Sequence, residues 1–392
     1  MGDLFTDVAS IDYPIVDADA HVYEPPDVWQ ARVPAALRSQ APRVLRTADE
    51  GDVWIFDGGA RVRAVGLMAA AGTSYLGFRP SGLTYDTIRR GHWDVQAHLA
   101  DMDADGIWAQ LLYPSVCEEG ARMFGDDRAL QRACVRAYNE WVLEFCAASP
   151  TRLYGHAVIP ATGIDDAIAE LDWALGQGFR GVLISTFPGG AVEPSNDDDP
   201  FWARAVEADI PVALHIGSFH ADGPVARRRF EPGAVLPRAA ASKSGANIVP
   251  LVARMLFSGL FERHPRVKVL LVEANIGWIP AMLEQTDDMF LRYRWFTGTA
   301  GTLPTMPSRV FHRNIWATFM IDTVGMELRH RLNLDHLMWS TDYPHTGTDW
   351  PNSRVTIARV FRGVPAGDVR KMLHDNCKRL YRLTDVPDRL DG

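Results

Sequence analysis

The chain has 392 residues, of which 47% are hydrophobic and 23% are charged, and its formal net charge at pH 7 is -9. This composition is ordinary for a globular protein with a large core, and the acidic balance argues against a nucleic-acid or anionic-membrane partner. The sequence has no long apolar run and no secretory signal, and its four cysteines form no CxxC pair. We therefore expect a cytoplasmic protein with free thiols.

Short apolar runs that are typical of buried strands alternate along the chain with amphipathic segments that predict helices. In chain order, the predicted strands are residues 15–22, 107–115, 153–161, 181–186, 211–218, 268–276, 315–322 and 337–345. Eight strands in this alternation predict an α/β fold, the (β/α)8 TIM barrel. An open doubly wound sheet is less favoured, because its Gly-rich phosphate-binding first turn is missing.

Residues 30–95 depart from the alternation. Turn signals around Gly51 and Gly58 predict short β hairpins in this segment. We expect one domain over residues 1–392, with a small β-rich insertion at residues 30–95 that lies over the barrel mouth. A second irregular stretch is expected over residues 218–242.

Ionisable residues stand at the ends of four predicted strands, where TIM barrels carry their active-site groups. These residues are Asp19 and His21, His215, Glu273, and Asp342. Any one of them alone is more often a hydrogen-bonded structural residue, but their coincidence on four strands favours a shared site.

Three of these residues are carboxylates, which cannot be buried ionised without a compensating cation. Arg and Lys are scarce near the predicted strand ends, so metal ions are the expected compensation. Ligands of the His and carboxylate type suit Zn, Fe or Mn.

The first strand reads IVDADAHV, with polar side chains at every second position. A period of two sends Asp17, Asp19 and His21 to one face, which in a barrel is the interior. We expect Asp19 and His21 to lie at the mouth as metal ligands. Asp17 lies deeper, so we expect it to orient a ligand by hydrogen bonding.

The motifs IVDADAH, ALHIG, VLLVEANIGW and STDYPH resemble the amidohydrolase-related family that includes aminocarboxymuconate-semialdehyde decarboxylase. The resemblance runs over residues 12–383 and implies a metal-dependent TIM barrel. It implies that Asp19 and His21, His215 and Asp342 are metal ligands, and that Asp342 also handles a proton. Decarboxylases and hydrolases of the family carry a histidine at the end of the sixth strand, where this chain has Glu273.

That departure resembles the TIM-barrel nonheme diiron monooxygenases of platensimycin and platencin biosynthesis. The resemblance implies two iron ions, O2 as co-substrate, an external electron donor and an apolar, acyl-CoA substrate of antibiotic biosynthesis. The charge count agrees with it, because two divalent ions and a hydroxide balance three carboxylates. A protonated aspartate or an arginine from a loop would balance them as well.

The function we expect from the sequence is therefore hydroxylation by a diiron monooxygenase. The alternative is a decarboxylase or hydrolase with one Zn or Mn ion, in which Asp342 is the base and Glu273 does not bind metal. A barrel that only binds a ligand is a third hypothesis, which the clustered ionisable groups disfavour.

The expected site residues fall into three sets. The metal ligands are Asp19, His21, His215, Glu273, Asp342 and His345, with His220 and Glu24 as further candidates, and Asp342 and Glu273 are also the expected catalytic residues. Arg227, Arg228 and Arg229 are candidates for contacts to coenzyme A phosphates, although an arginine run is more often a solvated face. Trp54, Phe56, Tyr75 and Phe78 of the insertion are expected to shield the substrate from water. The family resemblance also implies a homodimer.

Overall fold

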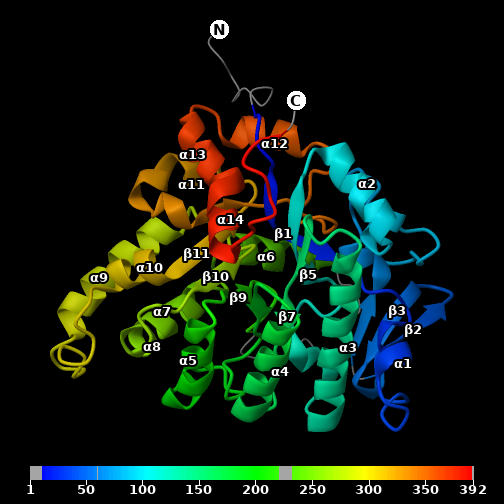
Figure 1. Ribbon diagram of the computed structural model, residues 1–392, viewed down its shortest axis with the longest axis horizontal. Helices are drawn as coiled ribbons and strands as arrows, with labels where there is room; N and C mark the ends of the chain where they lie inside the picture. Colours follow the sequence, from blue (N-terminus) through cyan, green and yellow to red (C-terminus); the bar gives the residue numbers. More distant parts are fainter. Residues whose placement is uncertain (1–10, 60, 220–231, 391–392) are drawn as a thin grey trace.

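The structure is a computed structural model, and it describes residues 11–59, 61–219 and 232–390. Within these residues, parallel strands form the wall of a barrel and helices cover its outside (Figure 1). The barrel strands are β1 (Val16–Val22), β5 (Ala109–Pro114), β6 (Leu153–Gly155), β7 (Ala157–Val158), β8 (Val182–Leu183), β9 (Val212–His215), β10 (Val269–Val272), β11 (Ile315–Phe319) and β12 (Leu337–Trp339). Together β6 and β7 occupy the third position, so the predicted TIM barrel is confirmed.

The strands form two sheet segments, β1-β5-β6 and β7-β8-β9-β10-β11-β12, with parallel pairing throughout. Backbone hydrogen bonds join the segments into a barrel. After β12, Asp342 N donates to Asp19 O at 2.9 Å and His21 N donates to Tyr343 O at 2.6 Å. The first and last strands therefore lie side by side, and their polar residues meet.

The helices begin and end at conventional sequence signals. Asp127 caps helix α3 by accepting a hydrogen bond from Leu130 N, and Gly106 ends α2 with φ +73°. None of the helices in the described ranges has the length and apolar character that crossing a bilayer requires. The helices are α1 (Val28–Arg32), α2 (Val95–Asp105), α3 (Arg128–Ala147), α4 (Ile164–Gly176), α5 (Asp199–Glu207), α6 (Pro232–Lys243), α7 (Val249–Phe257), α8 (Leu260–Arg263), α9 (Ile279–Tyr293), α10 (Pro307–Asn314), α11 (Thr323–Leu328), α12 (Ser353–Val360), α13 (Ala366–Arg370) and α14 (Asn376–Tyr381).

Several strands are shorter than the sequence predicts, because the backbone turns at the polar residues. Strand β10 ends just before Glu273, whose φ is +61°, and β12 ends before Asp342, whose φ is +57°. Side chains other than glycine rarely adopt this left-handed conformation, which is strained and is concentrated at functional sites. The predicted irregular stretch over residues 218–242 is also partly wrong, because Pro232–Lys243 is helix α6.

The insertion contains an antiparallel sheet of β2 (Arg43–Thr47), β3 (Gly51–Phe56) and β4 (Arg61–Ala64), which lies beside α1 in Figure 1. Trp54 and Phe56 are fully buried, and the Trp54 ring packs edge-on against Trp29 with centroids 4.9 Å apart. Tyr75 is 84% exposed. The prediction that these aromatic residues shield a substrate is therefore wrong for the three side chains, because two form a small core and one faces solvent.

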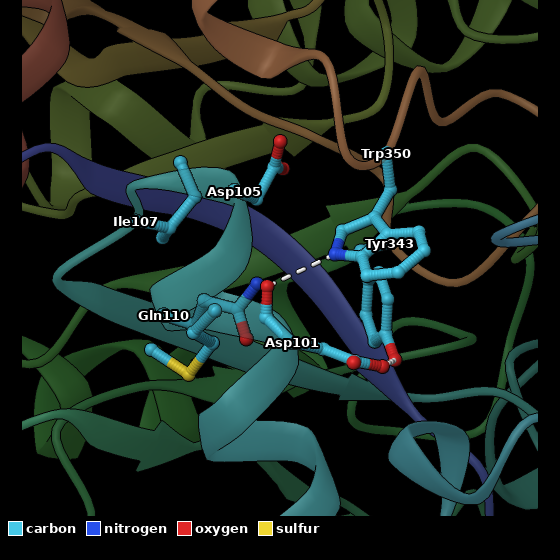
Figure 2. A pocket seen from close by; sticks show the side chains of 7 residues that line it. Asp101, Asp105, Ile107, Gln110, Tyr343 and Trp350 are labelled. Carbon is cyan, nitrogen blue, oxygen red and sulfur yellow. Dashed lines mark hydrogen bonds between the residues drawn. The ribbon is translucent and has the colours of Figure 1, made fainter.

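Helix α2 holds the segment after β12 in place. Tyr343 Oη donates to Asp101 Oδ2 at 2.7 Å, and Trp350 Nε1 donates to the backbone oxygen of Asp101 at 2.9 Å. These side chains line a small pocket between α2 and this segment (Figure 2). The contacts fix the loop that carries Asp342 and His345.

Candidate metal centre

Strand β1 carries three fully buried polar side chains, Asp17, Asp19 and His21. Its register against β5 shifts between Asp17 and Ala20, so the strand contains an irregularity that re-aims the side chains beyond it. His21 Nδ1 donates to Pro114 O at 2.9 Å. One proton is therefore on Nδ1, and Nε2 faces the neighbouring acidic groups, where a metal ion would replace its proton.

Side chains from three strands converge on this Nε2 atom. It lies 3.3 Å from His215 Nε2 at the end of β9, 3.4 Å from Asp19 Oδ1, and 3.7 Å from Asp342 Oδ1 after β12. Potential ligand atoms lie within 4.8 Å of one another in two groups, Asp19 with His21 and His215, and His21 with Asp342 and His345. The structure therefore brings these five predicted ligand residues together, and their role as metal ligands stays a prediction.

His345 lies at the edge of this cluster. Its ring stacks on His21 with centroids 3.7 Å apart, and its Nδ1 is 3.2 Å from Asp342 Oδ1. Its other nitrogen, Nε2, is 3.1 Å from Ser115 Oγ. His345 thus connects Asp342 to the end of β5.

The cluster fits a divalent metal ion. Both carboxylate oxygens of Asp19 and one of Asp342 are buried and have no hydrogen-bond partner among the described residues. Unpaired buried carboxylates are strongly unfavourable, so these oxygens need a cation. A set of imidazole and carboxylate ligands without thiolate suits Zn, Mn or Fe.

Burial and mutual charge set the proton affinities in the cluster. Burial raises the pKa of Asp19 to about 6, although the His21 imidazole, 3.4 Å away, lowers it. Burial lowers the pKa of His21, but Asp19 and the other nearby carboxylates outweigh this and raise it to about 9. Burial lowers the pKa of His215 to about 3, so that ring is neutral. A metal ion therefore competes with a proton at Asp19 and His21.

Glu273 is paired with Lys243, the last residue of α6, which the sequence analysis did not predict at the site. Lys243 Nζ forms an ion pair with Glu273 Oε1 and lies 3.2 Å from Asp342 Oδ2. The second Glu273 oxygen, Oε2, is 3.3 Å from His215 Nε2. Glu273 lies outside both close ligand groups, so the structure places it beside the cluster rather than within it.

Lys243 was missed because it directly follows the stretch that the sequence predicts to be irregular, residues 218–242, and lies far from any predicted strand end. The excess of carboxylates did indicate a missing cation, but it did not say which residue provides it. Burial lowers the pKa of Lys243, but the charges of Asp342 and Glu273 outweigh this and raise it.

Two other predicted residues have structural partners. Asp17 accepts hydrogen bonds from Thr341 N at 2.9 Å and from Gln110 Nε2 at 3.0 Å, which joins β1 to both neighbouring strand ends. Glu24 is buried away from the cluster, and its carboxylate accepts from Val116 N at 2.8 Å. The expectation that Glu24 binds metal is therefore not met. His220, Arg227, Arg228 and Arg229 lie outside the described residues.

A second ion pair that the sequence did not indicate lies near the cluster. Arg63 of β4 is buried, and its Nη1 is 3.1 Å from Glu118 Oε1 and 3.0 Å from Ser115 O. Burial raises the pKa of Glu118 to about 7, although Arg63 lowers it. The insertion thus brings a cation close to the end of β5.

The family model described as amidohydrolase matches residues 16–383. The chain belongs to the amidohydrolase family. Two curated amidohydrolase relatives are decarboxylases. Decarboxylase orsB of Emericella nidulans is 28% identical over 246 residues, which cover 56% of this chain and 68% of the relative. Gamma-resorcylate decarboxylase of Rhizobium sp. is 26% identical over 313 residues, which cover 74% of this chain and 88% of the relative.

Solved amidohydrolase structures have the same fold. An amidohydrolase from Mycobacterium avium subsp. paratuberculosis matches with a TM-score of 0.73 at 20% identity, covering 95% of this chain and all of that chain. A dihydroxybenzoic acid decarboxylase from Polaromonas sp. matches with a TM-score of 0.60 at 18% identity, covering 95% of this chain and 98% of that chain. The Polaromonas structure contains bound manganese and an inhibitor, 2-nitroresorcinol.

These relatives overturn the prediction of a diiron monooxygenase of antibiotic biosynthesis, because the curated relatives reported above are decarboxylases. The prediction relied on Glu273 and on a charge count that left Lys243 out. The expectation of two iron ions and O2 depended on that prediction, so it is no longer supported. The chain is an enzyme of a metal-dependent family, whereas an acyl-CoA substrate, an electron donor and a homodimer stay predictions.

Proposed function

We propose that this amidohydrolase is a decarboxylase that uses one Mn or Zn ion to release CO2 from a small aromatic carboxylic acid. The observation that carries the proposal is the convergence of Asp19, His21, His215 and Asp342, with unpaired carboxylate oxygens, at one end of the barrel. The decarboxylase relatives favour this reaction over hydrolysis.

The same four residues would hold the ion, which supplies positive charge that polarises the oxygens of the substrate. Asp19, His21 and His215 lie on barrel strands, and contacts with α2 hold the loop that carries Asp342. Asp17 holds the backbone of β1 beside β12, and His21 is held by Pro114 O. A rigid constellation of this kind keeps the substrate oriented during the reaction.

Decarboxylation breaks the bond between the ring carbon and the carboxylate carbon. The electron pair stays on the ring carbon, which takes up a proton as CO2 leaves. We assign the movement of this proton to Asp342, because its carboxylate is buried at the site and its Oδ1 faces His345. His345 lies 3.2 Å from that oxygen and connects it to Ser115.

Two cationic side chains lie near the site, and each is paired with carboxylates. Lys243 pairs with Glu273 and Asp342, and Arg63 pairs with Glu118 and Glu119. The bound ion would therefore be the charge that attracts and orients a carboxylate substrate.

The test is a metal-dependent assay of CO2 release. Metal-free protein is loaded with Mn²⁺ or Zn²⁺ and incubated without O2 with 2,6-dihydroxybenzoate, 5-carboxyvanillate and related hydroxybenzoic acids. We expect release of CO2 that needs the metal and is indifferent to O2, and its loss in Asp342→Asn. Asp126→Asn, a change of an exposed aspartate, is the matched control. Hydrolysis of esters or amides, without CO2 from any acid, would contradict the proposal.

A further inference from the structure

Lys243 lies between two carboxylates that come from different strands of the barrel. Its Nζ forms an ion pair with Glu273 Oε1, after β10, and lies 3.2 Å from Asp342 Oδ2, after β12. Neither carboxylate has an arginine or another lysine within ion-pair distance among the described residues. Lys243 is therefore the protein's own cation at this cluster.

The backbone around this contact is shaped for it. Glu273 and Asp342 both have left-handed backbone conformations, with φ of +61° and +57°. Gly347 packs closely on the pair, since a Cβ atom there would lie 2.0 Å from Asp342 Oδ2 and 3.4 Å from Lys243 Nζ. Strained residues and an obligatory glycine are unusual for a surface ion pair, and they indicate a fixed arrangement.

The charge of the site changes when Lys243 is counted. Asp19, Glu273 and Asp342 contribute three negative charges, and Lys243 returns one positive charge. Two negative charges remain when the histidines are neutral, and one divalent ion balances them. Arg63 pairs with both Glu118 and Glu119, and these three residues lie outside the two close ligand groups and are not part of this count.

We infer that Lys243 acts as the second cation of the metal site and limits the pocket to one divalent ion. Where a dinuclear centre would hold a second metal between Glu273 and Asp342, this chain has an ammonium group. The inference rests on the proposed metal site, but not on the reaction that the site catalyses.

The experiment measures how many Mn²⁺ ions the protein binds and how tightly, and it does not depend on catalytic activity. Metal-free wild type, Lys243→Met and Lys243→Arg are titrated with Mn²⁺ and followed by calorimetry and electron paramagnetic resonance. We expect one Mn²⁺ per chain in the wild type and in Lys243→Arg. Lys243→Met leaves one negative charge unbalanced, so we expect either a second, spin-coupled Mn²⁺ or affinity for the first ion that is higher by about tenfold or more.

A charge-restoring variant keeps the test decisive if Lys243→Met folds poorly. Lys243→Met combined with Glu273→Gln removes one charge of each sign and leaves two carboxylates. We expect this double variant to bind one Mn²⁺ with wild-type affinity. If Lys243→Met binds one ion with unchanged or lower affinity, or if the double variant behaves like Lys243→Met, the inference is overturned. A wild type that binds one ion and releases no CO2 would instead overturn only the proposed function.

Discussion

At the scale of the single residue, two aspartates on the same face of β1 differ in their environments. Asp17 accepts hydrogen bonds from the Thr341 backbone and the Gln110 side chain. Asp19 is equally buried, and its oxygens have no hydrogen-bond partner in the described ranges. A satisfied buried carboxylate holds the structure together, whereas an unsatisfied one is available to a ligand. The two residues should therefore respond oppositely to removal of their charge.

Asp19→Asn should weaken metal binding and stabilise the metal-free protein. The variant keeps the shape of the side chain but removes a charge that burial disfavours even beside His21, as the raised pKa of Asp19 indicates, so the free energy of unfolding should rise by about 1–3 kcal/mol. The affinity for Mn²⁺ should fall by about 100-fold. Urea unfolding with and without Mn²⁺ measures both effects, with Asp126→Asn as control. A metal-free variant less stable than the wild type would contradict this view of Asp19.

Asp17→Asn should have the opposite effect on stability. The amide nitrogen of asparagine would face donors such as Thr341 N, so at least one hydrogen bond becomes a repulsive contact between two donors. The expected loss in the free energy of unfolding is about 2–4 kcal/mol. Urea unfolding of the metal-free protein checks it, and a loss below about 0.5 kcal/mol would show that Asp17 is not needed to join β1 to β12.

At the scale of the element, the sequence predicts where most strands start better than where they stop. Apolar runs form the interior of the barrel, and the predicted polar residues lie at the end of β9 and after β10 and β12. The ends of β10 and β12 were misplaced because Glu273 and Asp342 adopt a left-handed backbone conformation, which the local sequence pattern does not predict. Helix α6 was missed for a similar reason, since its place over the site depends on tertiary packing rather than on propensity.

Glu24, a buried acidic residue that follows β1, could bind metal or could stabilise the fold, and a substitution distinguishes the two roles. Its carboxylate accepts hydrogen bonds from Val116 N at 2.8 Å and Cys117 N at 3.2 Å, which ties the end of β1 to the turn after β5. Glu24→Gln should cost about 1–3 kcal/mol of stability, because one acceptor oxygen becomes a donor.

Mn²⁺ content in Glu24→Gln should equal that of the wild type, as measured by metal analysis of the folded protein. Glu327→Gln, a change in an exposed glutamate, is the matched control and should alter neither quantity. If Glu24→Gln lost its bound Mn²⁺ but was as stable as the wild type, Glu24 would be a metal ligand after all.

At the scale of the whole molecule, the barrel explains why sequence reasoning found most of the cluster. Parallel strands that alternate with helices must deliver their carboxyl ends to one side, so residues far apart in sequence meet there. The identity of the balancing cation could not be found in this way, because Lys243 reaches the site from a helix rather than from a strand end. Because Lys243 was left out, the charge count favoured two iron ions, and the predicted reaction was wrong.

The same burial that builds the barrel makes the fold sensitive to acid. His156 lies between β6 and β7, and its Nε2 is within hydrogen-bond distance of Tyr381 Oη at 2.9 Å and of Tyr113 Oη at 3.1 Å. Burial lowers its pKa from the usual 6.5 to about 3. Below pH 6.5 His156 is protonated in the unfolded chain but stays neutral in the folded chain. The free energy of unfolding is therefore highest above pH 6.5 and falls as the pH drops towards 3.

His156→Gln should flatten this acid dependence. Between about pH 6.5 and 4.5 the wild type should lose roughly 2–3 kcal/mol of stability through His156. Glutamine can still accept a hydrogen bond from a tyrosine hydroxyl but does not titrate, so the variant should lack this loss even if it is less stable at neutral pH. Urea unfolding at several pH values, with EDTA to remove metal, gives the two slopes. His330→Gln, in which an exposed histidine is replaced, should keep the wild-type slope, and an equal slope in His156→Gln would mean that the acid sensitivity has another source.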